Sequence, residues 1–194
     1  MNMESRPMDQ VVFQHLQNHI EATMAMGENC APKIAEAAEN ITQALLAGHK
    51  IYSCGIGEKA PVSQLLVQYL TAGFEIERPG FSAIDLMSLI NGTNHTDGLS
   101  NALHIHGNNS DVLVVFSAQD NNDALVKTVE TALEKGMMVV SIAASIESLL
   151  MPATGSNHIE INCGESSSKA SAAMNFLIIQ CLCTLIDSKI FGEN

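Results

Sequence analysis

Two short apolar segments separated by a single helix place the strongest constraint on the fold. Residues 112–116 and 138–142 carry apolar side chains almost without interruption, and a pattern typical of an amphipathic helix fills 122–135 between them. A strand that is apolar on both sides must be covered on both faces, as in a parallel sheet with helices on either side. Crossovers through single helices favour right-handed β–α–β units. The sequence therefore predicts a three-layer α/β fold.

Weaker patterns supply the rest of the sheet. A glycine turn and a helix follow the first predicted strand, and a long helix over 167–190 follows the last. About five parallel strands are expected, at 50–54, 81–87, 111–117, 137–143 and 158–162.

Two helices are expected before the first strand. Apolar residues recur every fourth position across 9–26, at Val12, Leu16, Ile20 and Met24. The segment 27–31 interrupts this pattern, and Pro32 suits the first turn of a second helix that ends before Gly48. We therefore expect one domain over 1–194, with N-terminal helices in 1–48 and the α/β core in 49–194.

Charge and hydropathy exclude several classes of function. Lys and Arg number 9 against 21 Asp and Glu, so the formal net charge of −12 repels nucleic acid but not a basic protein. The apolar run 174–186 is shorter than the roughly 20 residues of a membrane span. The first ten residues lack the apolar core of a secretory signal, so we expect a cytoplasmic protein with no membrane contact.

Neither the cysteines nor the histidines indicate a metal site. The five cysteines have no CxxC spacing and are interpreted as small buried apolar residues. His104 and His106 have no acidic or cysteine partner nearby and are expected to be solvated or capping, while His95 is expected in a polar loop. His15 and His19 lie one helical turn apart, which could place two ligands on one face, although packing at an oligomer interface is the favoured interpretation.

Ligands of parallel α/β sheets bind beyond the carboxyl ends of the strands. The first of these ends carries Gly55-Ile56-Gly57, which lacks the third glycine of a dinucleotide fingerprint. The acidic residue expected after the second strand is also missing, because Asp85 lies within that strand. A nicotinamide cofactor is therefore not expected.

Four segments together carry a family resemblance. They are SCGIG at 53–57, ERPGFSAI at 77–84, the stretch from Val112 to Ile142, and CLCTLIDSKIF at 181–191. Their spacing resembles the sugar isomerase (SIS) domains of the phosphoheptose isomerase family over nearly the whole chain. The resemblance implies a flavodoxin-like sheet and a homotetramer held together by the N-terminal and C-terminal helices.

The resemblance also implies that catalysis is lost. Isomerases of this family move a proton between adjacent carbons of sedoheptulose 7-phosphate with carboxylate and imidazole groups, and many bind zinc with them. The matching positions here hold neither an effective base at neutral pH nor a zinc ligand set; they are Leu65, Tyr69, Ala172, Ala173, Asn175 and Gln180. No catalytic residue and no cofactor is predicted, and zinc would be expected only if the isomerase interpretation held.

The phosphate site implied by the resemblance is weakened. Glu58 and Asp120 would oppose a dianion, and most of the family's hydroxyl donors are absent. The residues still able to hold a phosphosugar are Gly55, Gly57, Lys59, Ser117, Asn121 and Asn122.

A branch of the family associates with the replication initiator DnaA, and the segment 181–191 resembles that branch most. There a leucine-phenylalanine pair follows the CLCxLID segment, and here Ile190 and Phe191 take its place. The resemblance implies a DnaA-docking surface at this pair, with Asp187 and Glu193 steering a basic partner. Helix-end packing is the alternative role of the pair. Three functions stay open: a tetrameric DnaA-binding scaffold, a sedoheptulose 7-phosphate isomerase, and a phosphosugar sensor without turnover.

Overall fold

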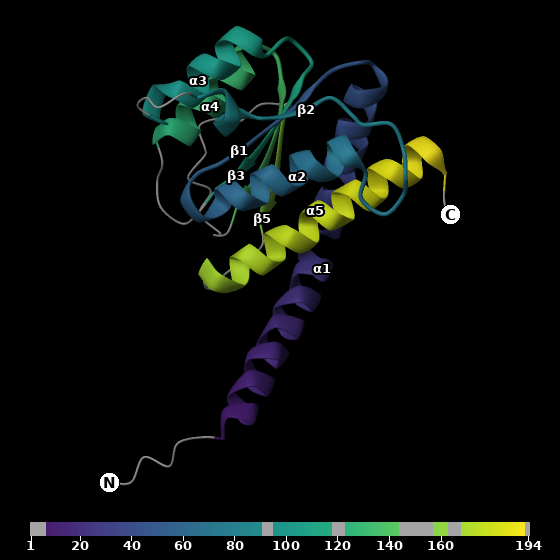
Figure 1. The fold of residues 1–194 in the computed structure, drawn as a ribbon, viewed down its shortest axis with the longest axis vertical. Helices are drawn as coiled ribbons and strands as arrows, with labels where there is room; N and C mark the ends of the chain where they lie inside the picture. The colour runs from purple at the N-terminus through teal and green to yellow at the C-terminus, as the bar shows by residue number, and fades with distance from the viewer. Residues whose placement is uncertain (1–6, 91–94, 118–122, 144–156, 163–167, 193–194) are drawn as a thin grey trace.

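The computed structural model describes residues 7–90, 95–117, 123–143, 157–162 and 168–192. Within them five strands form one parallel sheet in the order β2-β1-β3-β4-β5, seen nearly edge-on in Figure 1. The strands are β1 Ile51–Gly55, β2 Ala83–Asp85, β3 Val112–Phe116, β4 Met138–Ala143 and β5 His158–Asn162. The α/β fold with five parallel strands is therefore confirmed.

Helices cover both faces of the sheet, as the apolar strands require. One face packs against α1 (Met8–Leu46), α2 (Ala60–Ala72) and α5 (Ser168–Phe191), and the other against α3 (His95–His106) and α4 (Asp123–Glu134). Alternate residues of β3 enter the two apolar clusters: Val114 packs on the α1 and α5 side, and Val115 on the α3 and α4 side. Two 3₁₀ helices, η1 (Gly57–Lys59) and η2 (Leu86–Leu89), follow β1 and β2.

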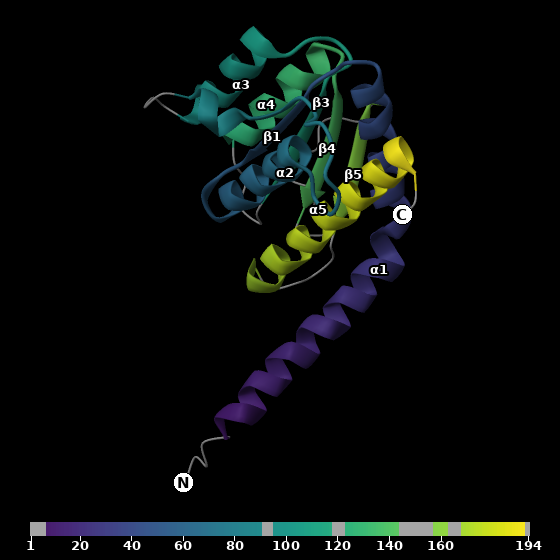
Figure 2. The same ribbon diagram turned by 45° about the vertical axis from the view of Figure 1, so that its right-hand side comes forward.

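The N-terminal segment is one helix of 39 residues, so the prediction of two helices is wrong. Pro32 lies inside α1 rather than at the start of a second helix. An internal proline costs about 3 kcal/mol, but an uninterrupted buried face runs past it, formed by Met26, Cys30, Ile34, Ala37, Ala38 and Ile41. Tertiary packing therefore overrides the break signal in 27–31. The N-terminal half of α1 projects away from the α/β body (Figure 2).

The region between β2 and β3 also differs from the expectation. The predicted strand 81–87 is only three residues long, because Asp85 caps η2 by accepting a hydrogen bond from the backbone N–H of Met87 (3.4 Å). Helix α3 was not predicted from the sequence, and His95, expected in a loop, is its first residue. His104 and His106 lie exposed in its last turn, as expected of solvated histidines.

The cysteines largely match their interpretation as buried apolar residues. Cys30, Cys54 and Cys183 are buried free thiols, whereas Cys181 is exposed and Cys163 lies outside the described residues. Burial raises the pKa of the Cys54 thiol, and it raises that of Cys183 to about 12, so both stay protonated near neutral pH. These two thiols are unsuited to nucleophilic chemistry.

Helix α5 is apolar enough to need a closer look. Its residues Ala173–Phe191 are long enough and apolar enough to cross a membrane, whereas the run 174–186 alone is too short. However, Ile178, Leu182 and Ile186 are fully buried in the cluster between α5, α1 and the sheet. These contacts are those of a core helix in an α/β fold.

Candidate functional site

The carboxyl ends of the central strands meet at one edge of the sheet, because β1 pairs in parallel with both β2 and β3. Ligands of such sheets bind at this edge. Gly55 and Gly57 lie there at the end of β1, followed by Lys59, and Ser117 follows β3. Asn121 and Asn122, also predicted to contact a phosphosugar, lie outside the described residues.

The turn after β1 requires its glycines. A Cβ on Gly55 would lie 2.5 Å from the carbonyl oxygen of Lys59, which is closer than any side chain tolerates. Gly57 has a φ of +60°, in the left-handed region that favours glycine. Lys59 is 1% exposed, whereas Glu58 is exposed on the turn. The solvent-facing charge of this turn is therefore negative, which disfavours a phosphate dianion.

Buried polar side chains connect β1, α2 and β2 near the same edge of the sheet. The Ser53 and Ser63 hydroxyls lie 2.8 Å apart, and the Ser63 hydroxyl donates to the Asp85 carboxylate (3.1 Å). Burial raises the pKa of the Asp85 carboxyl, and the hydrogen bond from Ser63 partly offsets this. Because this carboxylate also caps η2, its role is to hold β1, α2 and η2 together.

The positions that the resemblance matches to the acids and bases of the isomerases lie on α2 and α5, mostly in packing contacts. On α2, Leu65 is half-buried against the core, and the Tyr69 ring packs on Phe74 with 4.6 Å between ring centroids. On α5, Ala173 packs against the same core, Asn175 is fully buried and Gln180 lines an apolar groove; Ala172 is on the same helix. In the described part of the chain no three His, Cys, Asp or Glu side chains are grouped as metal ligands.

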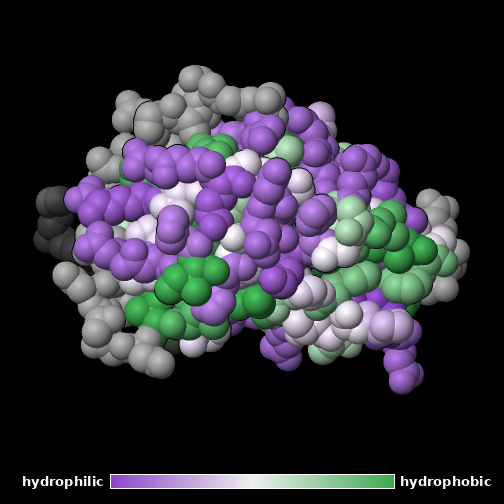
Figure 3. All heavy atoms as spheres, turned by 90° about the horizontal axis from the view of Figure 1, so that it is seen from above, coloured by the Kyte–Doolittle hydropathy of each residue, from purple (hydrophilic) through white to green (hydrophobic). Residues whose placement is uncertain are grey.

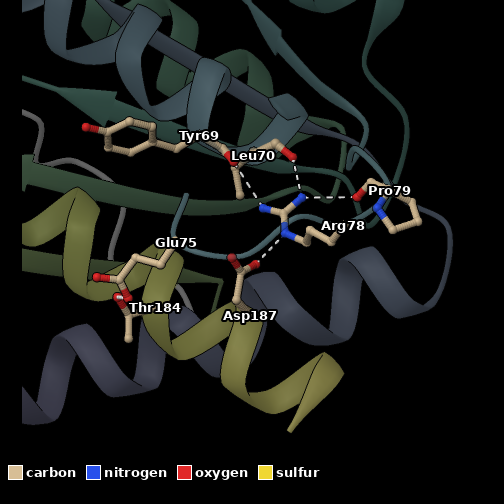
Figure 4. Close-up of polar contacts among 7 residues, drawn as sticks. All are labelled: Tyr69, Leu70, Glu75, Arg78, Pro79, Thr184 and Asp187. Carbon is tan, nitrogen blue, oxygen red and sulfur yellow. Dashed lines mark hydrogen bonds and ion pairs between the residues drawn. The ribbon is translucent and has the colours of Figure 1, made fainter. Parts of the chain in front are cut away.

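The strongest polar cluster lies elsewhere, at Arg78 beside the C-terminal end of α5 (Figure 4). The Arg78 Nε donates to the Asp187 carboxylate (2.6 Å), and the two side chains are 1% and 7% exposed. Its Nη atoms donate to the backbone carbonyls of Leu70 (2.9 Å), Pro79 (3.1 Å) and Tyr69 (3.0 Å). One guanidinium thus caps the last turn of α2 and fixes it to α5.

Aromatic rings extend this cluster to the surface. The Arg78 guanidinium carbon lies 4.0 Å from the centroid of the Phe81 ring. The Phe81 ring stacks in turn on Phe191, with centroids 6.1 Å apart and planes inclined by 23°. The sequence does not predict this arrangement, because nothing in the charge pattern marks Arg78, within the segment 77–84, as buried.

The two residues of the predicted docking pair differ in burial: one is packed and the other is exposed. Ile190 is half-buried against the core, whereas Phe191 is 47% exposed. The expectation that Asp187 steers a basic partner is wrong, because this carboxylate is buried in its ion pair with Arg78. Glu193, the second expected steering residue, lies outside the described residues.

A second exposed apolar surface lies on α1. Its N-terminal half exposes large apolar side chains at Met8, Val11, Val12, Phe13, Leu16, Ile20 and Met24. A groove of about 590 Å³ lies between α1 and α5, beside Phe74, and is lined mainly by apolar side chains. The α1 residues predicted to face another copy are thus exposed in a single chain.

Comparison with known proteins adds sequence relatives to this picture. Residues 14–144 match the model of a family described as "SIS domain". The "DnaA initiator-associating protein DiaA" of Klebsiella pneumoniae is 31% identical over 179 residues, which cover 89% of this chain and 91% of the relative. The protein of the same name from Escherichia coli O1:K1 is 30% identical over the same shares.

Solved structures share the fold. A phosphoheptose isomerase from Francisella tularensis has a TM-score of 0.85 and 23% identity, with 94% of this chain and 99% of that chain aligned. Phosphoheptose isomerase GmhA from Neisseria gonorrhoeae has a TM-score of 0.83 and 21% identity, with 94% and 100% aligned. The family model spans more than half of the sequence, and the resemblance inferred from four segments is confirmed: the chain belongs to the SIS-domain family.

Proposed function

We propose that this chain is a non-catalytic SIS-domain scaffold of the cytosol that assembles as a homotetramer and binds the replication initiator DnaA. The observation that carries the proposal is the 31% identity to DnaA initiator-associating proteins over 89% of the chain. The geometry at the end of α5 supports it, because Phe191 is exposed while its ring is held on Phe81. Aromatic side chains such as Phe are enriched at protein–protein interfaces.

The fixed position of Phe191 favours binding. Ordering a mobile side chain at an interface costs about 0.5–1.5 kcal/mol, and a side chain that is already held loses less freedom on binding. Arg78 holds Phe81, and Phe81 stacks on Phe191, so the exposed ring rests on a buried ion pair. Four copies of this surface on one assembly would raise the effective concentration of bound DnaA molecules without any catalysis.

The net charge of the chain favours a basic protein partner over DNA. The net charge of −12 attracts a basic partner from a distance and repels free DNA. One face of the molecule, shown in Figure 3, is largely hydrophilic and carries separate smaller hydrophobic patches. We therefore assign the DNA contact of any replication complex to DnaA and not to this chain.

Purified chain is expected to form tetramers that capture DnaA. The exposed apolar face of α1 and the groove beside α5 offer surfaces that a second copy could cover. Light scattering at micromolar concentration should give four times the chain mass of 20.7 kDa, and immobilised DnaA should retain the chain. A monomer would contradict the multivalent mechanism, and failure to bind DnaA would contradict the proposal as a whole.

Phosphoheptose isomerase is the second candidate, favoured by the shared fold. We expect no measurable turnover of sedoheptulose 7-phosphate, with or without zinc, because the family's acid and base positions hold side chains such as Leu65, Ala173 and Gln180. The assay compares the purified chain with a phosphoheptose isomerase such as that of Francisella tularensis. Turnover within a few tenfold of that enzyme would establish an enzyme and leave DnaA binding as a separate question.

A phosphosugar sensor is the remaining alternative. The edge beyond β1 and β3 keeps the glycine turn and Ser117, which suit an anion, but exposes Glu58. Calorimetric titration with sedoheptulose 7-phosphate separates this alternative from the scaffold. Binding without turnover would favour a sensor, and loss of that binding in Ser117→Ala would locate it at this edge.

A further inference from the structure

We propose that His15 and His19 form a chelating site for one divalent transition-metal ion on the N-terminal half of α1. The two residues are four positions apart, so their side chains lie one above the other on the same face of the helix. Their Nε2 atoms are 3.1 Å apart, and the rings meet edge to face with 4.5 Å between centroids. Two imidazole nitrogens therefore lie close enough together to reach one ion after a rotation of the rings.

The separation of the two nitrogens matches that of neighbouring ligands on one metal ion. Zinc–imidazole bonds are roughly 2.0–2.1 Å long, so two nitrogens 3.1 Å apart would subtend about 98° at the metal. This lies between the roughly 90° of square-planar or octahedral sites and the roughly 109° of a tetrahedral site. The backbone of α1 does not need to change for the two nitrogens to have this separation.

Binding also has a simple proton balance. When both rings are neutral, the hydrogen bond between them requires one ring to donate its Nε2–H and the other to accept it. The donating ring must shift to its Nδ1–H tautomer, which frees both Nε2 lone pairs without releasing a proton from the neutral pair. Two metal–nitrogen bonds then replace the hydrogen bond between the rings and two bonds from the ion to water, and the two water molecules are released.

The surroundings define which ions suit the site. His15 is exposed and His19 is half-buried, and among the described residues no third His, Cys, Asp or Glu joins them as a ligand. In a single chain, water therefore fills the remaining coordination positions. Imidazole ligands without thiolates favour Cu²⁺, Ni²⁺ and Zn²⁺ over Mg²⁺ or Ca²⁺, with Cu²⁺ the tightest.

Metal binding at this site depends on the helical conformation of α1. The two nitrogens lie close together only where α1 is helical, so binding of an ion stabilises that turn, and the stabilisation grows with the free ion concentration relative to the dissociation constant. The pair also borders Leu16 and Ile20 of the exposed apolar face. Metal binding would thus be linked to the order of the part of α1 that projects from the α/β body.

The test is a calorimetric titration of untagged full-length chain with Ni²⁺ near neutral pH. We expect one ion per chain and an affinity loss of at least about tenfold in His19→Gln, since even outer-shell changes weaken metal sites on this scale. The matched control is His104→Gln, because His104 and His106 are two positions apart and lie roughly 200° apart around α3. This control should bind Ni²⁺ as the natural chain does.

A spectroscopic readout separates chelation from nonspecific binding. The electron paramagnetic resonance spectrum with one equivalent of Cu²⁺ should show coupling to two imidazole nitrogens, and His15→Gln should reduce this to one. Far-UV circular dichroism of each variant checks that α1 is still helical. Unchanged Ni²⁺ affinity in a helical His19→Gln chain, or an equal loss in His104→Gln, would overturn the proposal.

Discussion

Replacing Asp187 with alanine is expected to lower the free energy of unfolding by about 3–5 kcal/mol, the usual cost of removing one partner from a buried ion pair. Asp187 is the carboxylate partner of Arg78, whose side chain is 1% exposed. Removing it would leave a guanidinium away from water with backbone carbonyls as its only described polar partners. Urea denaturation followed by circular dichroism measures the loss.

The control is an ion pair on the surface. Lys33 and Glu36 lie 2.7 Å apart on α1 with side chains 54% and 48% exposed, so Glu36→Ala should change stability by less than about 1 kcal/mol. A double variant, Arg78→Met with Asp187→Leu, removes both buried charges and should recover a large part of the loss. Equal small effects of Asp187→Ala and Glu36→Ala would show that the buried pair contributes little.

Truncating Ile190 and Phe191 together to alanine is expected to weaken DnaA binding by about 2 kcal/mol or more, or roughly 30-fold, if the pair is a binding hot spot. The structure predicts different effects for the two single substitutions. Phe191 is 47% exposed, so Phe191→Ala should reduce binding with little loss of stability. Ile190 packs on the core, so Ile190→Ala should mainly lower the unfolding midpoint.

Ile105→Ala provides the matched control, because this apolar residue is 73% exposed on α3, far along the chain from α5. It should leave both DnaA binding and assembly unchanged. Light scattering on each sample distinguishes a docking role from a structural one. Loss of binding with an unchanged assembly supports docking, whereas full binding by the double variant, or collapse of the assembly, would show that the pair is packing.

The parts of the fold that were predictable are those whose signal is local. Residues 112–116 are apolar on both sides, which specifies a doubly covered strand whatever the neighbours are, and β3 has these bounds. The break at 27–31 was a local signal as well, but the buried face from Met26 to Ile41 carries α1 through Pro32. Helix α3 was missed because its sequence, HTDGLSNALHIH, has few apolar residues to show periodicity.

At the candidate site, too, the local features were predictable from the sequence and the tertiary contacts were not. The resemblance pointed to Ile190 and Phe191 because they are adjacent in the sequence, but it could not separate their burial. The contacts that hold Phe191 join residues far apart in the chain: Arg78 and Asp187 are 109 positions apart. No periodicity or spacing rule covers such a pair, and a charged residue before Pro79 would ordinarily be placed on the surface.

The exposed part of α1 forms an arm that begins where the buried face of the helix ends. Met26 is the first buried residue of α1, and from Met26 to Met8 the helix extends about 27 Å at 1.5 Å per residue. A change of about 10° in the direction of this arm would move its tip near Met8 sideways by roughly 5 Å. The distance between partner molecules gathered by an assembly built on α1 would then depend on the angle at which this arm leaves the α/β body.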